Sequence, residues 1–244
     1  MEEIVKIPIA NKKFIYGTLN FINPQPDKLV IFVHGLFDNK NTHLIYSASH
    51  FLYNQGFTTF RFDLYSYKSD ARHFSQCSLS QHSKDLDRVI KYFNNTFRSI
   101  FIIGHSYGCL TILRSELDGL TAISLWELSS FISQPPTYFK YDQKIQKYIF
   151  NTGYDILVER KFVDDLYQFP NELDLINSIK CPIQIAYANG PNGALKKSSK
   201  RYYENILGEK DILAIDGANH SFQEEGVEQT LFNGTIKWFN RFEK

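Results

Sequence analysis

Several short segments of the chain are hydrophobic at consecutive positions rather than at alternate ones. They include residues 29–33, 99–103 and 122–126. A strand that is apolar on both faces is typical of the interior of a parallel sheet, because helices cover both faces of such a sheet. Residues 80–95, between the first two segments, have the apolar spacing of a helix. This alternation predicts an α/β fold with a mainly parallel central sheet and helices on both faces.

The same patterns place the remaining elements of a single domain over residues 1–244. Residues 3–9 and 13–21 are expected to form an opening hairpin of two strands. Further strands are expected at 57–62, 182–187 and 206–215, and further helices between 44 and 56, after 108, and at 227–239.

Residues 129–178 interrupt this alternation, and we expect them to form a small cap inserted into the domain. We expect a helix followed by a hairpin around residues 154–163. The aromatic side chains of the segment could line an apolar slot for an acyl or aryl group, or could pack the cap onto the domain. They are Phe131, Tyr138, Phe139, Tyr141, Tyr148, Phe150, Tyr154, Phe162, Tyr167 and Phe169.

Composition excludes several classes of protein. The net charge of the 244 residues is +1, which gives no general attraction to nucleic acids or to anionic membranes. The three cysteines are far apart, so we expect no disulfide framework, no metal site and no cofactor. No apolar stretch reaches the roughly 18 residues that a membrane span needs. The first residues lack the apolar core of a secretory signal, so we expect a cytoplasmic protein.

The strongest chemical signal is the sequence Gly-His-Ser-Tyr-Gly at positions 104–108. It has the pattern G-x-S-x-G and lies between an expected strand and an expected helix, which is the context that this motif requires. A sharp turn there would lift the hydroxyl of Ser106 above the sheet. The glycines on either side allow the backbone to pack closely where a Cβ atom would clash. We therefore expect Ser106 to be a nucleophile.

A serine hydroxyl is a poor nucleophile until a base takes its proton. His220 is the only histidine after Ser106, and it follows the last expected strand. The order serine then histidine, with the base near the C-terminus, is the order that a nucleophile on such a turn requires. His220 is therefore the candidate base.

With these residues in view, the chain resembles the α/β-hydrolase superfamily, especially its compact esterase, thioesterase and monoacylglycerol-lipase-like members. The resemblance covers nearly the whole chain. It is carried by His34-Gly35, Arg61-Phe-Asp63, the motif at 104–108, Cys181-Pro182 and Gly217-Ala-Asn-His220. The resemblance implies an α/β-hydrolase fold, acyl transfer to Ser106 and hydrolysis of the acyl-enzyme by water. It also implies an oxyanion hole formed by the backbone N–H groups of Leu36 and Tyr107.

The acid of the triad departs from the family pattern. Relatives usually carry it in the loop after strand 183–188, where this chain has no carboxylate and Asn192 stands at about the usual place. Asn192 could orient His220 through its side-chain oxygen. Alternatively, Glu127 could supply the acid, because it ends the strand beside the nucleophile strand. Asp216 is too close in sequence to His220 to reach behind it. In the third alternative, the protein binds an acyl compound and turns it over slowly or not at all.

Charged residues elsewhere have simpler explanations. Asp85 and Asp87 lie in the expected helix 80–95 and are interpreted as surface or capping charges. Lys196, Lys197, Lys200 and Arg201 cluster at an expected helix start; they form either a solvated face or a contact for coenzyme A or an acidic carrier protein.

The function that follows is a serine hydrolase that cleaves a small-molecule carboxylic ester or thioester without a cofactor. An acyltransferase on the same scaffold, in which an alcohol or amine replaces water, is the alternative within enzymes. A catalytically degenerate ligand-binding protein is the alternative outside them.

Overall fold

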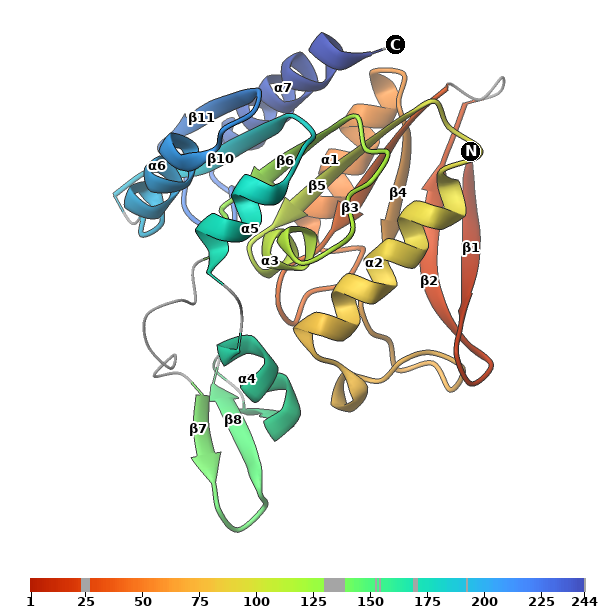
Figure 1. Cartoon of the computed structure of the whole chain (residues 1–244), viewed down its shortest axis with the longest axis vertical. Helices are drawn as coiled ribbons and strands as arrows, with labels where there is room; N and C mark the ends of the chain where they lie inside the picture. The colour runs from red at the N-terminus through yellow and green to blue at the C-terminus, as the bar shows by residue number, and fades with distance from the viewer. Residues whose placement is uncertain are drawn as a thin grey trace.

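An eight-stranded sheet forms the centre of this computed structural model, which describes residues 1–22, 27–129, 139–151, 153, 155–168, 171–191 and 193–243. The strand order is β1-β2-β4-β3-β5-β6-β10-β11 (Figure 1). The strands are β1 (Glu2–Ile9), β2 (Lys13–Asn20), β3 (Lys28–Val33), β4 (Thr58–Phe62), β5 (Ser99–His105), β6 (Ala122–Trp126), β10 (Ile183–Asn189) and β11 (Lys210–Asp216).

The sheet is antiparallel at one edge and parallel through the rest. Strands β1 and β2 form the expected opening hairpin, and β2 pairs antiparallel with β4. The pairings from β4 through β3, β5, β6 and β10 to β11 are all parallel. Because parallel strands end at the same edge, residues that follow β3, β5, β6 and β10 are brought together there. The prediction of a mainly parallel sheet is confirmed.

Helices cover both faces of the sheet, as the apolar patterns predict (Figure 1). Helices α1 (His43–Asn54) and α7 (Val227–Phe239) pack on one face, and α2 (Leu79–Phe93), α3 (Tyr107–Leu113), α5 (Glu172–Ser178) and α6 (Lys196–Asn205) on the other. Strand β3 shows why consecutive positions are apolar. Its residues Leu29, Ile31 and Val33 contribute to one core, whereas Val30 and Phe32 contribute to the core across the sheet. Short 3₁₀ helices occupy Phe74–Gln76 and Asn240–Phe242.

The inserted segment forms a three-stranded antiparallel sheet followed by a helix, and it extends from one end of the molecule (Figure 1). Its elements are β7 (Phe139–Asp142), β8 (Lys147–Asn151), β9 (Asp155–Val158) and α4 (Arg160–Tyr167). The expected order of a helix and then a hairpin around 154–163 is therefore wrong. Aromatic residues at alternate positions, such as Tyr148 and Phe150, have the period of a strand, whereas Phe162, Val163 and Leu166 have that of a helix.

Helix α4 is docked on the main domain beside the start of α2. The backbone N–H of Ser80 donates to the Asp165 carboxylate at 2.7 Å, and the Ser80 hydroxyl bonds to the same carboxylate. The buried ring of Phe162 stacks on Tyr107, the first residue of α3, with ring centroids 5.9 Å apart. The insertion therefore contacts the turn between β5 and α3 directly. Helix α5, by contrast, packs against α3 and α6.

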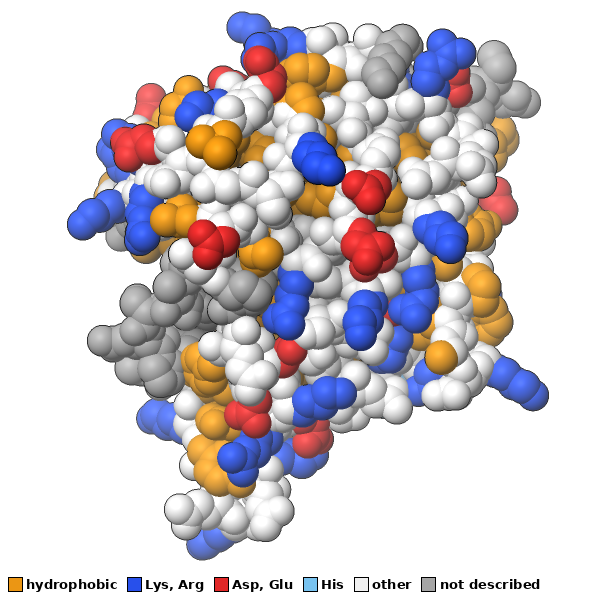
Figure 2. All heavy atoms as spheres, in the orientation of Figure 1, with side chains coloured by type: hydrophobic (Ala, Val, Ile, Leu, Met, Phe, Trp, Pro, Cys, Tyr) orange, Lys and Arg blue, Asp and Glu red, His pale blue; other side chains and the backbone are white. Residues whose placement is uncertain are grey.

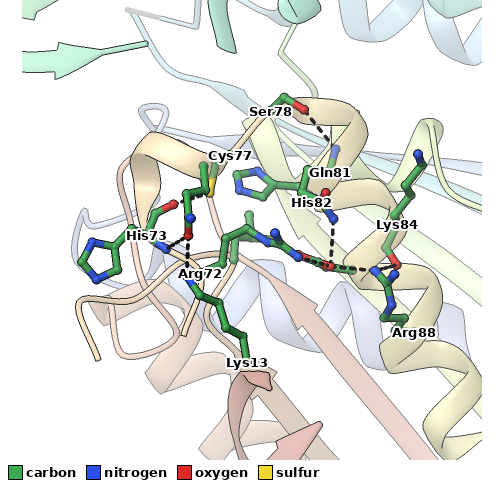
Figure 3. A network of polar contacts seen from close by, with 12 residues as sticks. Lys13, Arg72, His73, Cys77, Ser78, Gln81, His82, Lys84 and Arg88 are labelled. Carbon is green, nitrogen blue, oxygen red and sulfur yellow. Dashed lines mark hydrogen bonds and ion pairs between the residues drawn. The ribbon is translucent and has the colours of Figure 1, made fainter. Parts of the chain in front are cut away.

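Asp85 is buried, which corrects the expectation of a surface or capping charge. Its carboxylate accepts hydrogen bonds from Arg72 at 2.8 and 3.1 Å, from Arg88 at 2.9 Å and from Gln81 at 3.1 Å. Figure 3 shows this network, in which residues of the loop before α2 face residues of the helix itself. A buried carboxylate needs such partners because an unpaired charge is costly to bury. The network therefore holds the loop against α2.

The visible surface over α2 and α4 carries acidic and basic side chains interspersed with one another (Figure 2). This agrees with the net charge of +1 for the whole sequence. Among the helices in the described ranges, none has the length and apolar character that crossing a membrane requires.

Candidate active site

Ser106 lies on a sharp turn between strand β5 and helix α3. Its backbone has φ 54° and ψ −116°, a conformation that non-glycine residues rarely adopt and that costs about 1–3 kcal/mol. The Ser106 N–H donates to the carbonyl of Trp126, at the end of β6, at 2.9 Å. The turn therefore has the geometry that the motif at 104–108 predicts.

The glycines of the motif are required by close packing. A Cβ atom at position 108 would lie 2.2 Å from the carbonyl oxygen of Val33, at the end of β3. A Cβ atom at position 104 would lie 2.5 Å from the Ile112 side chain. The missing side chain at position 108 therefore lets α3 approach the end of β3, and the one at position 104 lets α3 pack on β5.

Three side chains from distant parts of the chain form a continuous hydrogen-bonded series. Nε2 of His220, in the loop after β11, is 2.9 Å from Oγ of Ser106. Nδ1 of the same ring is 2.9 Å from Oε2 of Glu127, which directly follows β6. An ionised carboxylate can only accept, so Nδ1 carries the proton and Nε2 is free to accept from the Ser106 hydroxyl.

Glu127 is held rigidly where it meets His220. Its side chain is 1% exposed, against 48% for His220. Its second carboxylate oxygen, Oε1, accepts the backbone N–H of Ala188 in β10 at 2.7 Å. The backbone of Glu127 also has a positive φ, 51°, so strands β5 and β6 are each followed by a strained residue that carries a polar side chain.

The other residues considered for the acid lie elsewhere or outside the described ranges. Asp216 accepts a hydrogen bond from the Asn189 side chain at 2.5 Å. Asn192 lies outside the described residues, so its role stays a prediction. Among the described carboxylates, Glu127 is the one that bonds to His220.

The two candidate oxyanion donors lie on neighbouring segments. Leu36 follows β3 and precedes Phe37, whose φ is 61°, and Tyr107 begins α3. Within the described part of the chain, neither backbone N–H donates a hydrogen bond to another group. His34 is buried beside them and accepts the N–H of Leu64 through Nε2 at 3.1 Å. Burial lowers the pKa of His34, so this ring is a neutral support for the turn.

Two further buried histidines support the site. Nε2–H of His105 donates to the carbonyl of His220 at 2.9 Å, and burial lowers the pKa of His105 to about 4. Nδ1 of His82 is hydrogen-bonded to the hydroxyl of Tyr107 at 2.9 Å, and burial lowers the pKa of His82 to about 3. Both rings are therefore neutral at neutral pH, and both hold a residue of the site in place.

Ser129 is a residue of the site that the sequence patterns missed. Its Oγ lies 2.9 Å from Oγ of Ser106. It belongs to no motif, and its only sequence signal is its place two residues after Glu127, where the chain leaves β6. No group of histidine, cysteine, aspartate and glutamate side chains within the described ranges has an arrangement that could hold a metal ion.

The strand order and the turn at Ser106 define the class of protein, which is the α/β-hydrolase fold. Residues 30–230 match the model of the alpha/beta hydrolase family, so the chain belongs to that family. A search of curated protein sequences finds no match.

Solved structures show the same fold over almost the whole chain. Est1E from Butyrivibrio proteoclasticus with bound ferulic acid is 16% identical, covers 98% of each chain and has a TM-score of 0.82. An esterase domain from Rhodothermus marinus is 15% identical, covers 99% of each chain and has a TM-score of 0.74. A monoacylglycerol lipase from Paleococcus ferrophilus is 15% identical, covers 94% of this chain and 99% of its own, and has a TM-score of 0.71.

Proposed function

We propose that this protein is a serine hydrolase that cleaves carboxylic esters or thioesters through an acyl-Ser106 intermediate. The observation that carries the proposal is the series Ser106–His220–Glu127, with both hydrogen bonds at 2.9 Å. A serine, a histidine in contact with it and a carboxylate behind the histidine are the parts that general-base activation of a hydroxyl needs. The names of two structural relatives, an esterase domain and a lipase, agree with ester hydrolysis.

In the first half of the reaction, Oγ of Ser106 attacks the carbonyl carbon while His220 takes its proton. Glu127 keeps the imidazole in the required tautomer and stabilises the imidazolium that forms. The N–H groups of Leu36 and Tyr107 would hold the oxyanion, and removing one such donor typically costs about 10²–10³ in rate. The leaving alcohol or thiol takes the proton from His220. In the second half, water attacks the acyl-enzyme with the same base.

The exposure of the base favours hydrolysis over transfer to another alcohol or amine. The His220 side chain is 48% exposed, so the base is open to solvent. An acyltransferase excludes water from the acyl-enzyme, because water would otherwise compete with the acceptor. The exposure of His220 therefore supports hydrolysis over acyl transfer to an alcohol or amine.

The aromatic side chains of the insertion differ in what they can contribute to substrate binding. Phe139 and Phe162 are buried and serve to pack the insertion. Phe150 is partly buried, and its ring lies 4.8 Å from that of Phe37, the residue after the candidate donor Leu36. We therefore expect Phe37 and Phe150 to contact the acyl or aryl group of a substrate.

A fluorophosphonate probe tests the proposed nucleophile directly. We expect the probe to label the wild-type protein at Ser106, to label the Ser69→Ala control equally, and to leave Ser106→Ala unlabelled. His220→Ala should label at least about 100-fold more slowly, because the base is absent. Equal labelling of wild type and Ser106→Ala would overturn the proposal. A series of p-nitrophenyl esters would then measure the preference for acyl length, and no preference would argue against contacts from Phe37 and Phe150.

A further inference from the structure

The nucleophile oxygen has a second partner besides the histidine. Oγ of Ser106 lies 2.9 Å from Nε2 of His220 and also 2.9 Å from Oγ of Ser129. The positions of the protons follow from Glu127: its carboxylate accepts Nδ1–H, so Nε2 carries a lone pair and the Ser106 proton points toward it. Oγ of Ser106 is then the acceptor in its other hydrogen bond. The Ser129 hydroxyl is therefore the donor.

Ser129 is held near the nucleophile by the same strand end that supplies the acid. Glu127 follows β6 with a positive φ, Leu128 is fully buried, and Ser129 comes next, half-buried. The backbone N–H of Ser106 donates to the carbonyl of Trp126, so the turn at Ser106 is tied to this strand end. The hydroxyl of Ser129 is thus positioned relative to Oγ by the buried strand end that precedes it.

We propose that Ser129 is a further catalytic residue, whose hydroxyl stabilises Oγ of Ser106 when this oxygen leaves the acyl group. The proposal rests on the function proposed above. In deacylation, His220 takes a proton from water, and the oxygen of the water bonds to the acyl carbon. The bond from this carbon to Oγ then breaks, and its electron pair goes to Oγ. Oγ takes the proton from His220, and the carboxylic acid departs.

The hydrogen bond from Ser129 should act more on deacylation than on acylation. Before acylation it already exists in the free enzyme, so it contributes to the ground state and to the transition state alike. In the acyl-enzyme, Oγ is an ester oxygen and a weak acceptor, and it gains negative charge only as the bond to carbon breaks. An interaction that strengthens only on the way to the transition state raises the rate.

The test compares Ser129→Ala with Ser129→Thr, which keeps a hydroxyl, on p-nitrophenyl acetate. Rapid-quench mass spectrometry of the intact protein at saturating substrate gives the acetylated fraction, and hence the ratio of the acylation rate to the deacylation rate. The loss of one neutral hydrogen bond should slow deacylation about threefold to tenfold, leave acylation within about twofold, and so raise that ratio. Ser129→Thr should restore the wild-type ratio. Peptide mapping should locate the acetyl group on Ser106.

Two outcomes would overturn the role of Ser129: an unchanged ratio in Ser129→Ala, which is also what an equal loss in both steps would give, or acetyl found on Ser129. Thermal unfolding of each variant separates a folding defect from a chemical one. Failure of the proposed function is distinguishable, because it would appear as acetylation and hydrolysis that persist in Ser106→Ala. If Ser106 is labelled and the ratio of acylation rate to deacylation rate is unchanged in Ser129→Ala, only the inference about Ser129 is overturned.

Discussion

The ends of strands β6 and β10 lie side by side at the same edge of the sheet, yet they serve the candidate site in different ways. β6 is followed directly by Glu127, whose carboxylate bonds to His220. β10 ends in Asn189, and the described residues next to it contribute backbone: Ala188 N–H donates to Glu127 at 2.7 Å, and Gly190 N–H donates to the Ala218 carbonyl at 3.0 Å. One strand end therefore presents the candidate acid, and its neighbour holds both that carboxylate and the histidine loop.

The comparison shows that a carboxylate can reach the histidine from the end of β6, without a carboxylate at the end of β10. Strands β6 and β10 are adjacent and parallel, so a carboxylate at the end of either strand is close to the loop that follows β11. The longer side chain of glutamate and the positive φ of Glu127 let β6 reach His220.

The largest expected effect comes from replacing Glu127, the candidate acid. Glu127→Gln should lower kcat on p-nitrophenyl acetate by about 10³–10⁴-fold, because an amide favours the wrong tautomer of the histidine. Asn192→Ala, at the place where relatives carry the acid, should stay within about twofold of the wild type. Steady-state kinetics of the two variants measure both effects. A large loss in Asn192→Ala with little loss in Glu127→Gln would contradict the role proposed for Glu127.

The second largest effect is expected from Gly190→Ala, which tests whether the end of β10 supports the loop that carries His220. A Cβ atom at position 190 would lie 2.3 Å from the Ala218 carbonyl oxygen, so Gly190→Ala must displace the loop that carries His220. A displacement of about 1 Å can cost up to about 100-fold in rate, and we expect a loss of about 10- to 100-fold in kcat. Gly208→Ala is the matched control, because a Cβ atom there meets nothing within 4 Å. Equal activity of the two variants would contradict this support.

The smallest effect concerns the buried histidines behind the strand ends, and it appears in stability rather than in rate. The pKa values of His105 and His82 fall from 6.5 to about 4 and about 3. Below pH 6.5 the unfolded chain takes up protons that the folded protein does not, so stability is complete above pH 6.5 and falls as pH decreases toward the folded values. Between pH 6 and pH 5 the unfolding free energy should drop by about 2 kcal/mol for the pair.

Urea unfolding at the two pH values measures the net change, to which Asp87 contributes with the opposite sign because burial raises its pKa to about 6. A free energy of unfolding that is flat between pH 6 and pH 5 would contradict this prediction. The contribution of His105 and His82 to the site would then have to be reconsidered.

Much of the fold could be predicted from the sequence because its signals are local. Consecutive apolar residues in β3 and β5 predict a sheet covered on both faces, and the motif at 104–108 predicts the strained turn at Ser106. The sequence also named Ser106, His220 and Glu127 as candidates, and the structure brings their side chains together. Their catalytic roles stay predictions.

The parts that could not be predicted depend on long-range geometry. The approach of the Glu127 carboxylate to His220 depends on how the end of β6 lies relative to the loop after β11, which no local pattern contains. Ser129 was missed because its approach to Ser106 depends on the turn after β6, and a lone serine carries no signal. The order of elements in the insertion was wrong because its aromatic content was interpreted without its periodicity.

The central claim is that the imidazole of His220 carries a proton on Nδ1 that is hydrogen-bonded to Glu127, and proton NMR tests it most directly. Proton NMR should show a low-field imidazole N–H resonance that disappears in His220→Ala, shifts in Glu127→Gln and is unchanged in Asn192→Ala. A low-field resonance that Glu127→Gln leaves unmoved would contradict the account.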